Sequence, residues 1–148
     1  MADHTTHHDS PAHASGGRHL QLIVVTPEAT TLDEPVDFVA LPLYDGETGI
    51  APGRAPLIGR LGYGELRLVS AGHTRRFYVD GGFVQVAGDV VSVLTNRALT
   101  AESVDTKVAA EMLAEARHRK ANSDELLAAR ERAEQQARAQ LRVASHAK

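Results

Sequence analysis

Residues 74–95 read TRRFYVDGGFVQVAGDVVSVLT. Three short runs rich in Val, Phe and Tyr follow one another here, at 74–80, 82–87 and 90–95, and the breaks between them are Gly-Gly and Gly-Asp. β-branched and aromatic residues favour extended chain, whereas glycine and aspartate favour tight turns. The stretch therefore predicts consecutive antiparallel β-strands.

The same alternation of strand and turn extends back to residue 19. Runs of Leu, Ile and Val occupy 19–26, 36–43 and 65–70, and Pro, Gly or Asp residues stand between them. Many short strands with frequent breaks predict an antiparallel sandwich or barrel, not a parallel sheet linked by helices. Because aromatic residues make up only 4% of the chain, the core is expected to consist of Val, Leu, Ile and Ala.

The composition changes abruptly near residue 100. Every glycine lies at or before Gly88, and the later chain is dominated by Ala, Glu, Arg and Leu. We expect three parts: a disordered His-rich tail at 1–18, a β-sandwich domain at 19–99 and a helical hairpin domain at 100–148. The tail histidines have no fixed geometry or supporting residues for a metal, so we predict no metal site there.

Capping residues outline two helices in the last part. Thr100 is the predicted N-cap of a helix over 101–120, and Ser123 is the predicted N-cap of a second helix. A connection this short requires an antiparallel pair. The apolar stripes on both helices are thin and rich in Ala, so packing of the helices is expected to contribute little stabilising free energy. The hairpin either packs on its own sandwich or leaves it to dock elsewhere.

Bulk properties exclude several classes of partner. The net charge of −3 argues against a nucleic-acid partner, because phosphate binding needs a clustered excess of Lys and Arg. The chain has no cysteine, so neither disulfides nor thiolate metal sites are available. It also has no apolar run near the roughly 20 residues that a membrane helix needs. Any association with a membrane is expected to come through partners.

A search for catalytic motifs finds none. The chain has no phosphate-binding loop, no dinucleotide fingerprint, no H-E-x-x-H and no nucleophile elbow. Asp45 and Glu47 lie in a turn rich in Gly and acidic residues, which is ordinarily a solvated loop. We predict that the chain carries no active site of its own.

Residues 46–57 read GETGIAPGRAPL. This segment resembles the signature G-E-x-G-I-x-P-G-H-A-P-L of the epsilon subunits of bacterial proton-translocating rotary ATP synthases. Similar features recur at 77–86, 90–98 and 140–144, so the resemblance covers nearly everything outside the tail. It implies a β-sandwich of about ten antiparallel strands followed by a C-terminal antiparallel two-helix hairpin.

The resemblance also implies a function. The chain would be a non-catalytic central-stalk subunit that links the gamma subunit to the membrane rotor ring and couples proton flow to ATP synthesis at sites on other chains. It would be a peripheral protein at the cytoplasmic face of the bacterial inner membrane. The candidate partner interface lies in the signature segment and comprises Glu47, Gly49, Ile50, Pro52, Arg54 and Pro56.

In bacterial relatives the hairpin can extend along gamma towards the catalytic alpha and beta subunits and block ATP hydrolysis. Basic side chains would then pair with acidic loops, although each exposed pair is worth only about 0–1 kcal/mol. The candidate contacts are Arg117, Arg119, Lys120, Arg130, Arg132 and Arg138. The alternative for each of them is an ordinary solvated helix face.

Two positions depart from the family pattern. Arg54 stands where the family often has His, which alters one contact without threatening the fold. Some relatives bind ATP on the hairpin through an aliphatic-Asp-x-x-Arg-Ala pattern, but residues 104–109 read VDTKVA, with Val108 in the Arg position. Because a guanidinium partner for phosphate is missing, we predict no cofactor and weak or no ATP binding.

Two other classes of function remain open at this point. The chain could be a β-sandwich module that recognises a peptide or a sugar, although such a module has no need of the signature at 46–57. It could also be an enzyme whose site carries no recognisable motif.

Overall fold

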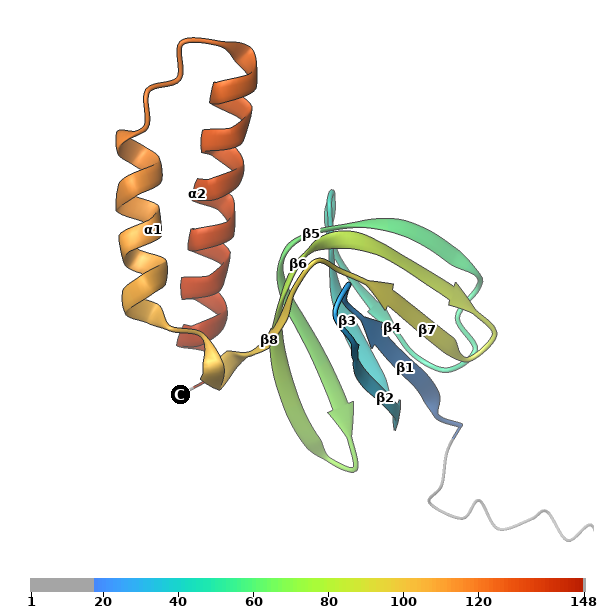
Figure 1. Cartoon of the computed structure of the whole chain (residues 1–148). Coiled ribbons are helices and arrows are strands. Elements are labelled where there is room, and N and C mark those ends of the chain that lie inside the picture. Colours follow the sequence, from blue (N-terminus) through green and yellow to red (C-terminus); the bar gives the residue numbers. More distant parts are fainter. Residues whose placement is uncertain (1–17, 148) are drawn as a thin grey trace, which may run out of the picture.

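The computed structural model describes residues 18–147, and the polypeptide forms eight strands, a short 3₁₀ turn and two helices (Figure 1). The strands are β1 Leu20–Val25, β2 Thr30–Val36, β3 Phe38–Leu43, β4 Gly46–Ile50, β5 Leu57–Ser70, β6 His73–Ala87, β7 Val90–Leu94 and β8 Ala98–Thr100. The helices are α1 Thr106–His118 and α2 Asp124–Ser145. The predicted sandwich with a C-terminal helical hairpin is confirmed. The predicted disordered tail lies, apart from Arg18, outside the described residues.

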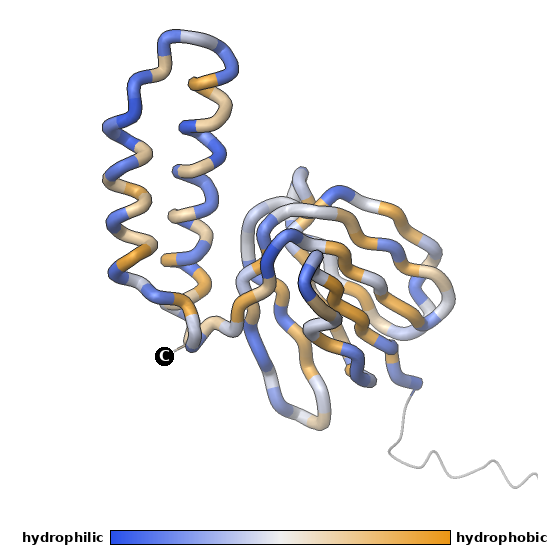
Figure 2. The backbone as a smooth tube through the Cα atoms, in the orientation of Figure 1, coloured by the Kyte–Doolittle hydropathy of each residue, from blue (hydrophilic) through white to orange (hydrophobic). Residues whose placement is uncertain are grey.

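The strands hydrogen-bond in the order β2-β1-β7-β6-β5-β3-β4, and β8 pairs with β6. All pairs are antiparallel except β1 with β7. Figure 1 shows the long β5–β6 pair curving, so that the sheet folds over on itself. The inward side chains form one aliphatic core, as expected from the composition, and it includes Leu22, Val39, Leu41, Ile50, Leu68, Val79, Val84 and Val93. Figure 2 shows the matching alternation of hydrophobic and hydrophilic positions along the strands.

The sheet has eight strands rather than about ten, and one of the predicted turns is a bend inside a single strand. The runs 74–80 and 82–87 both belong to β6. Gly81 and Gly82 adopt φ of +69° and +111°, a region that residues with a side chain rarely occupy. The backbone therefore changes direction without leaving the sheet. The first half of β6 pairs with β8 and the second half with β7.

The bend brings two backbones into close approach. A Cβ atom added to Gly82 would lie 1.8 Å from the carbonyl oxygen of Leu94 on β7. Only a residue without a side chain allows this approach. The β6–β7 packing therefore depends on glycine at position 82.

The first helix begins later than predicted. Thr100 still belongs to β8 and makes no side-chain capping bond, and a 3₁₀ turn at Ala101–Ser103 follows it. The N-cap of α1 is Asp105, whose Oδ1 accepts from the backbone N–H of Val108 at 3.1 Å. The N-cap of α2 is Ser123, as predicted, and its Oγ accepts from the N–H of Leu126 at 3.2 Å.

The helices pack through small residues. Ala109 and Ala116 on α1 and Ala137 on α2 are completely buried, so the helix axes can approach closely. Figure 1 shows the hairpin projecting from the sandwich, with the end of α2 near the sheet. The main contacts between the helices and the sheet are those of α2 with β5 and β6. Between residues 18 and 147 no helix has the length and apolarity needed to cross a membrane.

The bend in β6 yields a first prediction. Gly82→Ala should destabilise the chain by more than about 3 kcal/mol, because a methyl group cannot share space with the Leu94 carbonyl and the φ is unfavourable. Gly88→Ala is the matched control, since Gly88 has φ +59° but open space around its Cα. That control should cost only about 1–2 kcal/mol. Urea unfolding measures both, and equal losses would contradict the argument.

Candidate partner interface

An apolar row crosses the outer face of the sheet. The cross-strand pairs Val25–Leu94, Leu94–Phe83 and Phe83–Arg60 place these side chains side by side, and the backbone of Tyr44 bonds to that of Arg60. Exposed fractions are 54% for Leu94, 60% for Phe83 and 68% for Tyr44. We call Val25, Leu94, Phe83 and Tyr44 the apolar row, and Arg60 lies between Phe83 and Tyr44. A row of large apolar side chains that solvent reaches marks a protein-binding surface.

Strand alternation explains why the row faces outward. Val84 and Val86 point into the core, so Phe83 on the same strand must point to the opposite face. The neighbouring strand adds Ile58, which is 79% exposed, beside Gln85. The outer face of β5, β6 and β7 therefore carries large exposed apolar side chains beside polar ones such as Arg60 and Gln85.

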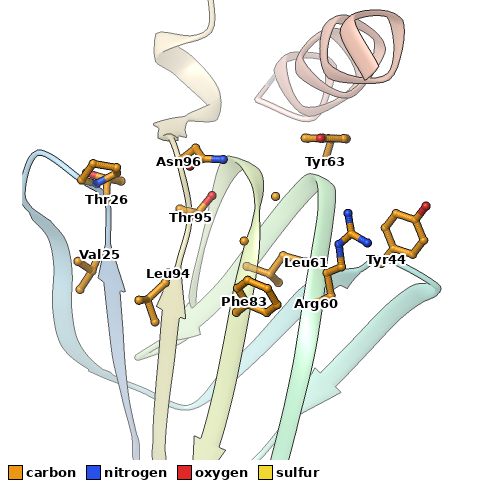
Figure 3. Close-up of a pocket in the computed structure, with 13 residues that line it drawn as sticks. Val25, Thr26, Tyr44, Arg60, Leu61, Tyr63, Phe83, Leu94, Thr95 and Asn96 are labelled. Carbon is orange, nitrogen blue, oxygen red and sulfur yellow. The ribbon is translucent and has the colours of Figure 1, made fainter. Parts of the chain in front are cut away.

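The row borders a hollow of about 670 Å³ (Figure 3). Gly81 and Gly82 line it without side chains, and Thr95, Asn96 and Tyr63 supply polar groups at its edge. Arg60 is the one charged residue among those that line it, and its guanidinium lies 4.4 Å from the centre of the Tyr44 ring. Tyr and Arg around an apolar hollow are typical of the energetic centre of protein interfaces.

The predicted interface residues at 46–57 lie in and beside the β4–β5 loop. Glu47 and Pro56 are exposed, and Pro52 is half-buried. Arg54 is exposed, but its Nη1 donates to the carbonyl of Gly49 at 2.8 Å, so the side chain folds back on its own loop.

Two of the predicted residues, Gly49 and Ile50, lie at the end of β4, just before the loop. Ile50 is completely buried in the core, so it offers no surface in this conformation. A Cβ on Gly49 would lie 2.9 Å from the Phe38 ring, so glycine there permits close packing. Ile50 therefore anchors the start of the loop in the core, whereas Glu47, Gly49, Pro52, Arg54 and Pro56 are accessible to a partner.

The six basic residues predicted as hairpin contacts fall into two groups. Three of them have acidic neighbours on the hairpin itself: Arg119 lies 3.2 Å from Glu115, and Arg130 and Arg138 lie 4.0 and 3.5 Å from Glu134. Among residues 18–147, no ion pair within 4.0 Å involves the other three, which are Arg117, Lys120 and Arg132. These three side chains are exposed. Arg117 and Lys120 lie beside the turn between the helices, and Arg132 lies further along α2.

The hairpin docks on the sandwich through a small mixed cluster. Ala139, Val143 and Ala144 of α2 pack against Tyr78 of β6, which is completely buried. Asp80 Oδ1 accepts hydrogen bonds from Tyr78 Oη at 2.8 Å and from Gln136 Nε2 at 2.9 Å. Burial, and after it the hydrogen bond to Asp80, raises the pKa of Tyr78 well above its usual range, so the phenol stays protonated and donates.

A second polar contact closes the end of α2. His146 Nδ1 lies 3.2 Å from Glu65 Oε2, and Arg76 Nη1 lies 3.2 Å from Glu65 Oε1. Sequence reasoning missed this docking site. A signal was present, because Phe77, Tyr78 and Val79 are three consecutive apolar residues, which indicates a strand covered on both faces.

Within the described part of the chain, no cluster of three or more His, Asp or Glu side chains is arranged to hold a metal ion. The four histidines near the N-terminus lie outside the described residues.

The fold and this surface define a small β-sandwich protein with a helical appendage and an open apolar sheet face. Residues 19–101 match the family model described as "ATP synthase, Delta/Epsilon chain, beta-sandwich domain". The chain is 49% identical over 124 residues to the ATP synthase epsilon chain of Rhodopirellula baltica, covering 84% of this chain and 97% of that one. It is 44% identical over 100 residues to the epsilon chain of Carboxydothermus hydrogenoformans, covering 68% and 75%.

Two solved structures have a similar fold. A chain of the Euglena gracilis mitochondrial ATP synthase, solved as OSCP/F1/c-ring, superposes with a TM-score of 0.77 at 25% identity and covers 93% of this chain and 91% of its own length. A chain of the Tetrahymena thermophila enzyme, from its central stalk and c-ring, shares the fold with a TM-score of 0.69 at 12% identity, covering 86% and 97%. The chain belongs to the ATP synthase epsilon chain family, which confirms the resemblance found at 46–57. This membership favours the epsilon-subunit prediction over a peptide- or sugar-binding module.

Proposed function

We propose that the chain is the non-catalytic central-stalk subunit that joins the gamma subunit to the membrane rotor ring, and that it thereby helps proton flow drive ATP synthesis on other chains. The observation that carries the proposal is the apolar row, which leaves Phe83, Leu94 and Tyr44 exposed on one sheet face. Exposed apolar surface of this kind is suited to a lasting interface with another subunit. We assign this face to gamma.

The two ends of the sandwich are expected to face different partners. Figure 1 shows the β4–β5 loop and the β6–β7 turn at the end far from the hairpin. If the hairpin points to the catalytic alpha and beta subunits, this far end faces the membrane. We therefore assign the accessible residues Glu47, Pro52, Arg54 and Pro56 to the rotor ring. The chain would be a peripheral protein on the cytoplasmic face of the bacterial inner membrane, held there through its partners.

The hairpin is proposed as a detachable brake on ATP hydrolysis. It rests on the sandwich through a few Ala and Val side chains, the Asp80–Gln136 hydrogen bond and the His146–Glu65 contact. Such a small contact suits two states of similar free energy, of which the second docks elsewhere. Of the six candidate basic side chains, the exposed Arg117, Lys120 and Arg132 are the ones most available for acidic loops of alpha and beta.

The assignment of the apolar row to gamma is tested by Phe83→Asp. Because Phe83 is 60% exposed, the isolated chain should unfold at nearly its usual urea concentration. Its affinity for purified gamma should fall by about 30-fold or more, as for a central interface residue. Calorimetry measures the affinity. His73→Ala, on the exposed β5–β6 hairpin, should bind like the wild type.

Two results would contradict this proposal. The first is a Phe83→Asp chain that binds gamma with unchanged affinity. The second is a tagged wild-type chain that recovers no gamma, alpha or beta subunits from its own membranes, as judged by mass spectrometry.

The brake is tested with two neighbouring glutamines on α2. Gln136→Ala removes the hydrogen bond to Asp80 and should weaken docking by about 1 kcal/mol, which is about fivefold in the opening equilibrium. Amide exchange in the second half of α2 should quicken accordingly, and ATP hydrolysis by the reassembled complex should slow. Gln135→Ala, whose side chain is exposed, is the control. Faster exchange without any change in hydrolysis would refute the brake but leave the docking site intact.

The absence of ATP binding is also proposed. Val108 on α1 presents an apolar side chain, 47% exposed, where a guanidinium would be needed. Calorimetry of the isolated chain with Mg-ATP should give a dissociation constant on the order of millimolar or weaker. Micromolar binding would overturn this statement.

A further inference from the structure

The β4–β5 loop at residues 51–56 has little internal support. Its backbone bond runs from the N–H of Arg54 to the carbonyl of Ala51 at 3.2 Å. The Arg54 side chain adds the bond to Gly49 described above. Gly53 adopts φ +85°, in the left-handed region, so the chain reverses sharply at this residue. A loop of this kind needs an external contact to keep one shape.

Asp89 in the β6–β7 turn supplies that contact. Its Oδ1 accepts a hydrogen bond from the backbone N–H of Gly53 at 3.0 Å. Its Oδ2 accepts from Arg18 Nη2 at 2.7 Å and from Arg18 Nε at 3.2 Å. Its backbone carbonyl accepts from the N–H of Gln21 at 2.7 Å. One residue thus joins the loop, the turn and the start of β1, which are distant in the sequence.

The carboxylate is well suited to this task. Both of its oxygens are used at once, by a neutral amide on one side and a guanidinium on the other. The Gly53 N–H, followed by Arg18, lowers the pKa of Asp89, so the side chain is ionised at neutral pH. Hydrogen bonds to an ionised acceptor are shorter and stronger than those between neutral groups.

We infer that Asp89 is the positioning residue that holds the loop 51–56 in the conformation its partner binds, with Arg18 orienting the carboxylate. The inference rests on the proposed function, which assigns this loop to the rotor ring. A loop that is already ordered loses less conformational entropy on binding, so a clamp increases affinity without touching the partner. Neither residue belongs to the segment 46–57 by which the interface was predicted.

The experiment compares full-length variants of the isolated chain and of the reassembled complex. Asp89→Ala should increase hydrogen exchange of the Gly53 amide by about fivefold or more and shift its amide proton resonance. It should also weaken binding to membranes that carry the rotor ring but have been stripped of the catalytic head. Asp89→Asn keeps a side-chain oxygen for Gly53 and loses the ion pair, so its effect should be smaller.

Controls separate the clamp from general destabilisation. Asp33→Ala removes an exposed aspartate that bonds to β1, through Gln21, and should leave Gly53 unchanged. Arg18→Ala should loosen the loop less than Asp89→Ala, because the bond from Gly53 to the carboxylate remains. Thermal unfolding confirms that each variant is folded.

The outcomes distinguish this inference from the function on which it rests. An unchanged Gly53 amide in Asp89→Ala overturns the clamp. A loosened loop with weaker ring binding supports both the clamp and the ring assignment. If the loop loosens while ring binding stays at the wild-type level, the clamp stands and the assignment of the loop to the ring fails.

Discussion

The backbone of Gly82 runs so close to the carbonyl of Leu94 that no side chain fits between them. The approach allows β6 to bend and still remain hydrogen-bonded on both sides of the bend. The two halves of the strand then face different neighbours. Before the bend, Tyr78 and Asp80 meet the end of α2, and after it Phe83 joins the apolar row. Both proposed binding regions therefore depend on the same pair of glycines.

The two contacts of the sandwich differ in physical character. The apolar row presents large side chains that are exposed in the isolated chain. Burying such side chains in an interface lowers the free energy, which favours a permanent complex. The hairpin cluster instead combines Ala and Val side chains with a few hydrogen bonds, which can be replaced by water at modest cost. One face thus suits a lasting partner, and the other suits a reversible one. This difference supports our proposal that the sandwich stays bound to its partner while the hairpin detaches.

The sequence predicted the strands and helices better than the points at which one element ends and the next begins. The strand runs, the helical hairpin and the Ser123 cap were predictable because hydrophobic pattern and capping chemistry are local. The bend at Gly81 and Gly82 was predicted as a turn between two strands. A glycine pair is compatible with a turn and with a bend inside one strand, and only the pairing of β6 with β7 and β8 distinguishes the two. Asp105 is the cap instead of Thr100, because Thr100 is held in β8 by its pairing with Phe77 of β6. The signature loop was found, whereas the apolar row and Asp89 were not.

By itself, the sequence determined that the chain is a β-sandwich with a helical hairpin, and the segment 46–57 identified its family. These properties depend on residues near one another along the chain. Only the tertiary structure decided which apolar side chains lie outside the core, since Phe83 and Val84 look equally suited to it in the sequence. The structure also brought Asp89 to Gly53, and Asp80 to Gln136, across 36 and 56 residues. Such contacts are set by strand register and bending, which no local pattern encodes.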